Sequence, residues 1–225
     1  MPQTTREPGV KAIAINGSPR KKWNTAVLLN KALEGACAGG AEVEIVHLYE
    51  LDFKGCRSCF ACKARGGPSY GKCSVDDGLT PILRKIEGAT VLLVGSPIYF
   101  GSVTGEVRSF LERLLFPHVS YGSPSPTPAS RQIRSGLIYT MNVKEDQARV
   151  NGYFQHLENN ERVLKRCFGH AETLYSFDTY QFDDYAKVVA DRFDPMLKAK
   201  RRQEVFPVDC QKSFELGSRL AREDA

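Results

Sequence analysis

Four cysteines in the first third of the chain have a spacing that is typical of cluster ligands. Cys56, Cys59 and Cys62 are separated by two residues at each step, and Cys73 follows after ten more. Short Cys-x2-Cys steps wrap backbone around one cluster, as at the start of bacterial [4Fe-4S] ligand runs. A zinc site usually joins two separated Cys-x2-Cys pairs, which this segment lacks. The compact trio favours one [4Fe-4S] site that includes Cys73, whereas the long step to Cys73 counts against it. The alternatives are an empty loop of four thiols and an interaction protein folded around zinc.

A second group of polar residues follows the first apolar run. Residues 10–15 read as a buried strand, and the loop from Gly17 to Thr25 leads into a segment of helical spacing. The start of that helix offers free N–H groups and the positive end of its dipole. The side-chain donors that converge there are Ser18, Arg20, Asn24 and Thr25. This combination predicts an anion site, and the alternative is an ordinary polar turn with a helix cap.

The common nucleotide-binding motifs do not match this loop. It contains no Gly-x-Gly-x-x-Gly, and Lys22 and Trp23 occupy the positions where the Walker motif needs Gly and Lys. A Mg²⁺-dependent response regulator is also disfavoured, because the first and third strands end without acidic residues, in Asn16-Gly17 and Gly95-Ser96. We therefore expect a mononucleotide that is bound in another way.

The loop from Gly95 to Gly105 suits a planar ring. Its small residues allow close backbone approach, and Tyr99 and Phe100 offer flat apolar surface. Taken alone, these two aromatic residues are more typical of packing than of ligand binding. Their importance comes from their position, because ligands bind beyond the carboxyl ends of parallel strands at the switch point of an open sheet.

Five apolar runs alternate with helical patterns and predict an α/β fold with a doubly wound parallel sheet, with helices on both faces. The expected strands are residues 10–15, 41–48, 89–96, 135–143 and 170–177, and one long helix is expected over about 146–168. We expect one domain over 1–225, with a Cys-rich insertion at 52–75 and a helical extension over about 180–225. A Pro- and Ser-rich segment at 120–130 interrupts the pattern.

Composition and charge limit the classes of binding partner that the protein can have. The chain has 225 residues, of which 42% are hydrophobic and 25% charged, with a net charge of +5. This excess is too small for a nucleic-acid-binding footprint. No apolar stretch is long enough to span a bilayer and no signal core is visible, so we expect a cytoplasmic protein. The basic run Lys198, Lys200, Arg201 and Arg202 reads as a solvated helix face, and Cys37, Cys167 and Cys210 read as small core residues.

The motifs together resemble one family. GSPR followed by NT, GSPIYFGSVTGEVRSFLERL, CRSCFACKARGGPSYGKCSVDD and the later FPVDCQKSFELGSRLA look like the NADPH-dependent FMN reductase family, specifically its iron-sulfur flavoprotein branch. The resemblance implies a flavodoxin-like fold, with the FMN phosphate held by Ser18, Arg20, Asn24 and Thr25. It assigns the flavin ring to Pro97, Ile98, Tyr99, Phe100 and Gly101, with Met141 and Asn142 at the far ring edge.

One residue departs from the family pattern. Trp23 stands where the family usually has Gly just before the Asn-Thr pair. If the loop requires a positive φ there, a Trp side chain would be strained.

The resemblance implies a redox function. NAD(P)H or a reduced carrier would deliver electrons to FMN, which would pass them to a quinone, a flavin or a protein. The flavin carries the chemistry, so no catalytic side chain is assigned. The rival function is an electron-transfer module with a ferredoxin-like partner. The resemblance also implies a homodimer or homotetramer.

Overall fold

A computed structural model describes residues 9–121 and 132–222. Five parallel strands lie in the order β2-β1-β3-β5-β6, which is the flavodoxin-like order with its switch point between β1 and β3. The strands are β1 (Lys11–Asn16), β2 (Glu42–His47), β3 (Val91–Tyr99), β5 (Ile133–Thr140) and β6 (Gly169–Ser176). The predicted doubly wound sheet is confirmed.

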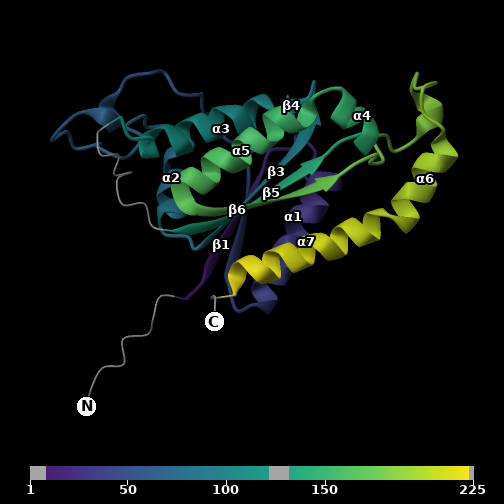
Figure 1. Ribbon diagram of the computed structural model, residues 1–225, viewed down its shortest axis with the longest axis horizontal. Coiled ribbons are helices and arrows are strands. Elements are labelled where there is room, and N and C mark those ends of the chain that lie inside the picture. Colours follow the sequence, from purple (N-terminus) through teal and green to yellow (C-terminus); the bar gives the residue numbers. More distant parts are fainter. Residues whose placement is uncertain (1–8, 122–131, 223–225) are drawn as a thin grey trace, which may run out of the picture.

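Helices cover both faces of the sheet (Figure 1). Alternate residues of β1 and β3 point into two separate apolar cores, which is why both strands read as continuous hydrophobic runs. One face carries α1 (Asn24–Ala38) and α7 (Phe206–Ala221). The other face carries α2 (Thr80–Glu87), α3 (Gly105–Leu115) and α5 (Tyr153–Phe168).

The C-terminal extension is part of this architecture. It contains the short helix α6 (Pro195–Glu204) and then α7, which lies along α1 (Figure 1). A Cβ atom added to Gly217 would lie 1.7 Å from the carbonyl oxygen of Ala32, and one added to Gly35 would lie 1.9 Å from that of Phe214. The two helices therefore pack with their backbones in direct contact, which only glycine allows.

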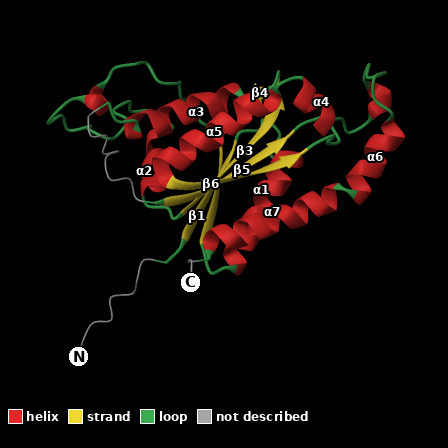
Figure 2. Cartoon of the chain, viewed as in Figure 1, coloured by secondary structure: helices red, strands yellow, loops and turns green. Residues whose placement is uncertain are grey.

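Three local expectations from the sequence are wrong. The single helix predicted over about 146–168 is two, α4 (Glu145–Val150) and α5, because Gly152 adopts a left-handed conformation with φ of 73° between them. A sixth strand, β4 (Ser102–Val103), pairs antiparallel with the end of β3 (Figure 2). Cys37 is exposed rather than in the core, whereas Cys167 is buried.

Within the described ranges, no helix has both the length and the apolar character needed to cross a bilayer. Most of the Pro- and Ser-rich segment falls outside the described residues.

Candidate functional site

The predicted anion loop lies at the carboxyl end of β1, where it leads into α1. Ser18 Oγ accepts a hydrogen bond from the Arg20 backbone N–H at 3.1 Å, which closes a tight turn. Trp23 precedes α1 with a φ of −106°, so its side chain causes no backbone strain. No side chain caps the first turn of α1 and no acidic residue lies in it. The first N–H groups of α1 are thus placed to receive an anion.

The segment after β6 lies along this loop. Asn24 Nδ2 and Trp23 Nε1 donate to the Tyr180 carbonyl at 2.8 and 3.0 Å. Arg20 stacks over the Trp23 ring at 4.5 Å and donates to the Gln181 carbonyl at 2.8 Å. Thr25 is buried, and its hydroxyl pairs with that of Thr140 at 2.7 Å. Three of the four predicted donors therefore already hold the loop against neighbouring strands and the C-terminal segment.

The basic run on α6 is not a solvated face, which corrects the prediction. Lys198 is only 4% exposed and donates to both oxygens of Asn142 and to Asp178. Arg201 donates to Asp209 at 2.5 Å, and Arg202 donates to the Asn24 side chain at 2.7 Å. Lys200 alone is exposed. The prediction failed chiefly because the partners of Lys198 and Arg202 come from distant parts of the chain.

The predicted ring loop is a β-hairpin between β3 and β4. Ile98 pairs with Val103 and Tyr99 with Ser102, so Phe100 and Gly101 form a two-residue turn. Both turn residues have positive φ, 52° and 78°, as a type I′ turn requires. Phe100 is fully exposed and Tyr99 half exposed, whereas Gly101 lies against the Tyr153 ring. The turn therefore places the exposed Phe100 side chain at the edge of the site.

Thr104 joins the two loops. Its hydroxyl donates to the Gly17 carbonyl at 2.9 Å and also caps α3 by accepting from the Val107 N–H. The Gly17 N–H in turn donates to the Gly95 carbonyl at 2.8 Å. A Cβ atom on Gly17 would lie 1.9 Å from the Val107 side chain, so only glycine fits between them. The predicted anion loop and the predicted ring loop therefore form one hydrogen-bonded unit.

The other residues predicted to contact the flavin ring differ in their burial and in their hydrogen bonds. Pro97 and Ile98 are partly buried on β3. Met141 is buried in the core, and its backbone N–H and carbonyl bond to Ser176 and Thr179. Asn142 is held by Lys198 at both of its oxygens. Asn142 is therefore positioned from α6, a connection that the local sequence does not reveal.

The Phe100 turn leads to a prediction about stability. A non-glycine residue in the left-handed region costs about 1 kcal/mol or more, and glycine relieves this cost. Because the Phe100 side chain is fully exposed, little packing is lost on its removal. We expect Phe100→Gly to be more stable than Phe100→Ala by about 1 kcal/mol, measured as denaturant midpoints. Equal midpoints, or Ala above Gly, would contradict the strained turn.

The four cysteines of the Cys-rich segment line one small pocket. Ser58 and Phe60, one residue from each step between the first three cysteines, have positive φ of 54° and 56°, which turns the chain sharply at each step. Cys62 is buried, Cys56 and Cys73 are half-buried, and Cys59 is exposed. The all-thiol set around one pocket fits a cluster, in which each thiolate binds a different iron. In the described ranges, no three His, Cys, Asp or Glu side chains are arranged to hold a single metal ion.

The thiols differ in their surroundings. Hydrogen bonds, the largest from the Ser74 hydroxyl, hold the pKa of the exposed Cys59 thiol below its ordinary value. Burial raises the pKa of the Cys62 thiol.

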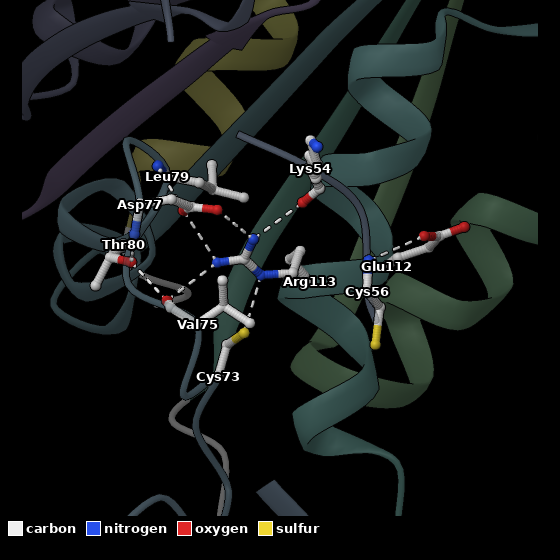
Figure 3. Close-up of polar contacts among 9 residues, drawn as sticks. All are labelled: Lys54, Cys56, Cys73, Val75, Asp77, Leu79, Thr80, Glu112 and Arg113. Atoms are coloured by element: carbon white, nitrogen blue, oxygen red, sulfur yellow. Dashed lines mark hydrogen bonds and ion pairs between the residues drawn. The ribbon is translucent and has the colours of Figure 1, made fainter. Parts of the chain in front are cut away.

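Arg113 ties the two ends of the Cys-rich segment together (Figure 3). This α3 residue is only 1% exposed. Its Nε donates to the Cys73 sulfur at 2.9 Å and its Nη1 to the Lys54 carbonyl at 2.9 Å. Two further bonds, of 2.8 and 3.1 Å, reach both carboxylate oxygens of Asp77. The sequence analysis missed Arg113, although its place three residues after the core residue Phe110 was a signal that it faces inward.

Asp77 has two roles at this point. Its carboxylate accepts a hydrogen bond from the Leu79 N–H at 3.0 Å and its own N–H donates to Thr80 Oγ1 at 3.0 Å, which closes the turn that leads into α2. Burial alone would raise the pKa of its carboxyl, but hydrogen bonds and charge, chiefly from Arg113, hold that pKa below the ordinary value.

The lowered pKa of Asp77 predicts a pH dependence of stability. Because the folded pKa lies below the unfolded value of about 3.9, the ion pair stabilises the fold above that pH. The contribution is lost as the pH falls through the folded pKa. We expect Asp77→Asn to be less stable at neutral pH and to show a shallower loss of unfolding free energy below about pH 4. Urea titrations at stepped pH measure this, and an unchanged acid slope would contradict it.

Comparisons with known proteins identify the family of the chain. Residues 10–127, just over half of the chain, match the NADPH-dependent FMN reductase family. An iron-sulfur flavoprotein of Archaeoglobus fulgidus is 39% identical over 104 residues, covering 46% of this chain and 48% of that protein. A second from the same organism is 33% identical over 156 residues, covering 69% and 63%. One from Methanocaldococcus jannaschii is 35% identical over 104 residues, covering 46% and 51%. The first and third matches thus span about half the length of the relative.

Solved structures share the fold at low identity. The NAD(P)H:quinone oxidoreductase from Methanothermobacter marburgensis aligns with a TM-score of 0.65 at 12% identity, covering 95% of this chain and all of that one. An FMN-dependent NADH-azoreductase from Bacillus anthracis, in complex with FMN, aligns with a TM-score of 0.62 at 13% identity, covering 95% and 100%. With the family match and the joined loops at the switch point, we conclude that the chain belongs to the NADPH-dependent FMN reductase family.

Proposed function

We propose that the protein is an FMN-dependent oxidoreductase that passes electrons from NAD(P)H, or from a reduced carrier, to a quinone, a flavin or a protein. The observation that carries this proposal is the single unit at the switch point, where the uncapped start of α1 adjoins the Tyr99–Phe100 hairpin through Thr104. One loop offers N–H groups for a phosphate and the other offers flat apolar surface for a ring. Family membership supports the choice of FMN.

The chain's own residues would bind and orient the flavin. Ser18, Asn24, Thr25 and the first-turn N–H groups of α1 surround the proposed phosphate position, with Arg20 at its edge. Pro97 to Gly101 would line the ring, and Asn142, fixed by Lys198, would stand at its far edge. Bound FMN supplies two-electron and one-electron transfer, and the protein tunes it through backbone hydrogen bonds and nearby charge.

The cysteine pocket is proposed to hold a [4Fe-4S] cluster through Cys56, Cys59, Cys62 and Cys73. The pocket lies at the C-terminal end of α3, whereas the ring hairpin directly precedes the N-terminal end of the same helix. Eleven residues at 1.5 Å each place the two ends of the helix about 16 Å apart. A cluster at one end and a flavin at the other would link one-electron donors to two-electron acceptors.

Anaerobic purification with cofactor analysis tests both sites. We expect a yellow protein with bound FMN and about four irons and four sulfides per chain, lost in Cys59→Ser but kept in the matched variant Cys37→Ser. Protein that neither carries nor takes up FMN would refute the flavin assignment. Protein that keeps FMN but takes up no iron on reconstitution would refute the cluster alone. Zinc without a yellow chromophore would favour the interaction-protein alternative.

Steady-state NAD(P)H oxidation separates the enzyme from a carrier. If the protein is a reductase, NADH or NADPH bleaches the flavin and a quinone or free flavin restores its colour. If pyridine nucleotides leave the flavin oxidised while a reduced ferredoxin-like donor bleaches it, the electron-transfer module is the better description.

We also propose that the chain forms a homodimer or homotetramer. The support is the fully exposed Phe100 at the rim of the flavin site, which a second copy would cover. Light scattering at micromolar concentration should give at least twice the chain mass, and a monomer would contradict the proposal.

A further inference from the structure

Two arginines at the start of α1, Arg20 and Arg202, have no carboxylate partner among the described residues. The positive end of the α1 dipole lies there, and its first turn contains no acidic residue. From α6, Arg202 reaches this region through its hydrogen bond to Asn24. Asp178 pairs with Lys198 and Asp209 with Arg201, but among the described residues no carboxylate pairs with Arg202 or Arg20. The site therefore carries positive charge that an anion would balance.

Arg202 is the α6 cation that reaches the loop itself. Its Nη1 donates to Asn24 Oδ1 at 2.7 Å, and its guanidinium lies over the Phe206 ring at 4.0 Å. The side chain is half-buried, and burial lowers its pKa, with the charge of Arg201 acting in the same direction. Its Nε and Nη2 have no protein partner among the described residues, so they are available to a ligand.

Arg201, the neighbouring residue, also has a guanidinium nitrogen without a hydrogen-bond partner among the described residues. Nη1 of Arg201 is buried and has no hydrogen-bond partner in the described part of the chain, although Nη2 of the same guanidinium bonds to Asp209. Buried donors are almost always satisfied, so an unmet guanidinium N–H indicates a missing acceptor. By contrast, Arg20 already donates to the Gln181 carbonyl.

We propose that Arg202 is a phosphate-binding residue of the flavin site, contributed by α6. The proposal rests on the proposed FMN function and adds a residue that its motif does not contain. A guanidinium binds phosphate through two parallel N–H groups, and Arg202 keeps two nitrogens for this while the third positions Asn24. The phosphate would then lie between the start of α1 and α6.

FMN and riboflavin distinguish a phosphate contact from a structural role, because riboflavin is the same molecule without the phosphate. The test variant is Arg202→Gln, which removes the charge but keeps an N–H donor for Asn24. The matched control is Lys200→Gln, which removes an exposed charge from the same helix. Dissociation constants come from quenching of flavin fluorescence in cofactor-stripped protein.

We expect Arg202→Gln to weaken FMN binding on the order of tenfold or more and to leave riboflavin binding unchanged. Lys200→Gln should change neither. If Arg202→Gln fails to fold, Arg202→Lys, which keeps the charge without the planar fork, should give a smaller loss for FMN only. Equal losses for FMN and riboflavin, or no loss for FMN, would overturn the role of Arg202. A parent protein that binds neither flavin would instead refute the proposed function.

Discussion

Arg113→Met is expected to lose about 3–5 kcal/mol of unfolding free energy and to take up no iron. The guanidinium is 1% exposed and joins Lys54, before the first cysteine, to Cys73, the last one (Figure 3). Its removal leaves the Asp77 carboxylate without its cation and the Lys54 carbonyl without this donor. A thioether of similar length restores none of these bonds. Chemical denaturation and iron analysis after anaerobic reconstitution measure the two effects.

The control for Arg113 is an exposed ion pair. Arg149 pairs with Glu145 at 2.6 Å, with 62% of its side chain exposed. Arg149→Met should cost only about 0.2–1 kcal/mol, because exposed pairs gain little. Near-parental stability of Arg113→Met would show that the buried network contributes no more than a surface pair. Destabilised protein that still takes up iron would show that Arg113 supports the fold but not the cysteine site.

Gly217→Ala is expected to lose about 3 kcal/mol, at the upper end of the cost of overpacking. The added methyl group would lie 1.7 Å from the Ala32 carbonyl oxygen and 2.9 Å from its Cα atom. Both are backbone atoms that no rotamer change can move, so α7 and α1 must separate. The better helix propensity of alanine, about 1 kcal/mol, offsets only part of the loss. A shift of the denaturant midpoint measures the effect.

Gly105→Ala is the matched control, since Gly105 is also helical and nothing lies within 4 Å of its added Cβ atom. It should leave the midpoint unchanged or raise it slightly. If Gly217→Ala behaves in the same way, the close backbone contact between the two helices does not exist in solution.

Local patterns predicted the sheet and the positions of the loops after β1 and β3 because their causes are local. Both faces of β1 and β3 are buried, so their residues are apolar in succession, and the loops that follow combine small and polar residues. The same reasoning failed where the cause lies elsewhere. β4 has only two residues and exists because the Phe100–Gly101 turn folds it back onto β3. Gly152 indicates a helix break, but the helical patterns on its two sides were read as one continuous helix.

The candidate site shows the same division. The predicted donors of the loop after β1 lie within eight positions of one another, whereas the charged residues that contact this loop and the cysteine pocket come from elsewhere in the chain. Arg113 can be buried because it pairs with Asp77, which lies 36 positions earlier in the sequence. Arg202 donates to Asn24, which lies 178 positions earlier. An arginine on a helix is normally solvated, and only a partner brought by the fold reverses this. A local spacing pattern cannot identify a partner that lies so far away in the sequence.

The place of α7 in the chain determines when one of the two cores can form. Its residues Phe206, Leu216 and Leu220 pack with α1, whose own sequence ends at Ala38. At about 5–20 residues per second, a ribosome finishes α1 roughly 10–40 s before it finishes α7. Until then, the apolar face of α1 has no cover from α7 and is exposed to other nascent chains. The protein is thus a candidate client for chaperones that bind the growing chain, and slower translation would lengthen its exposure to aggregation.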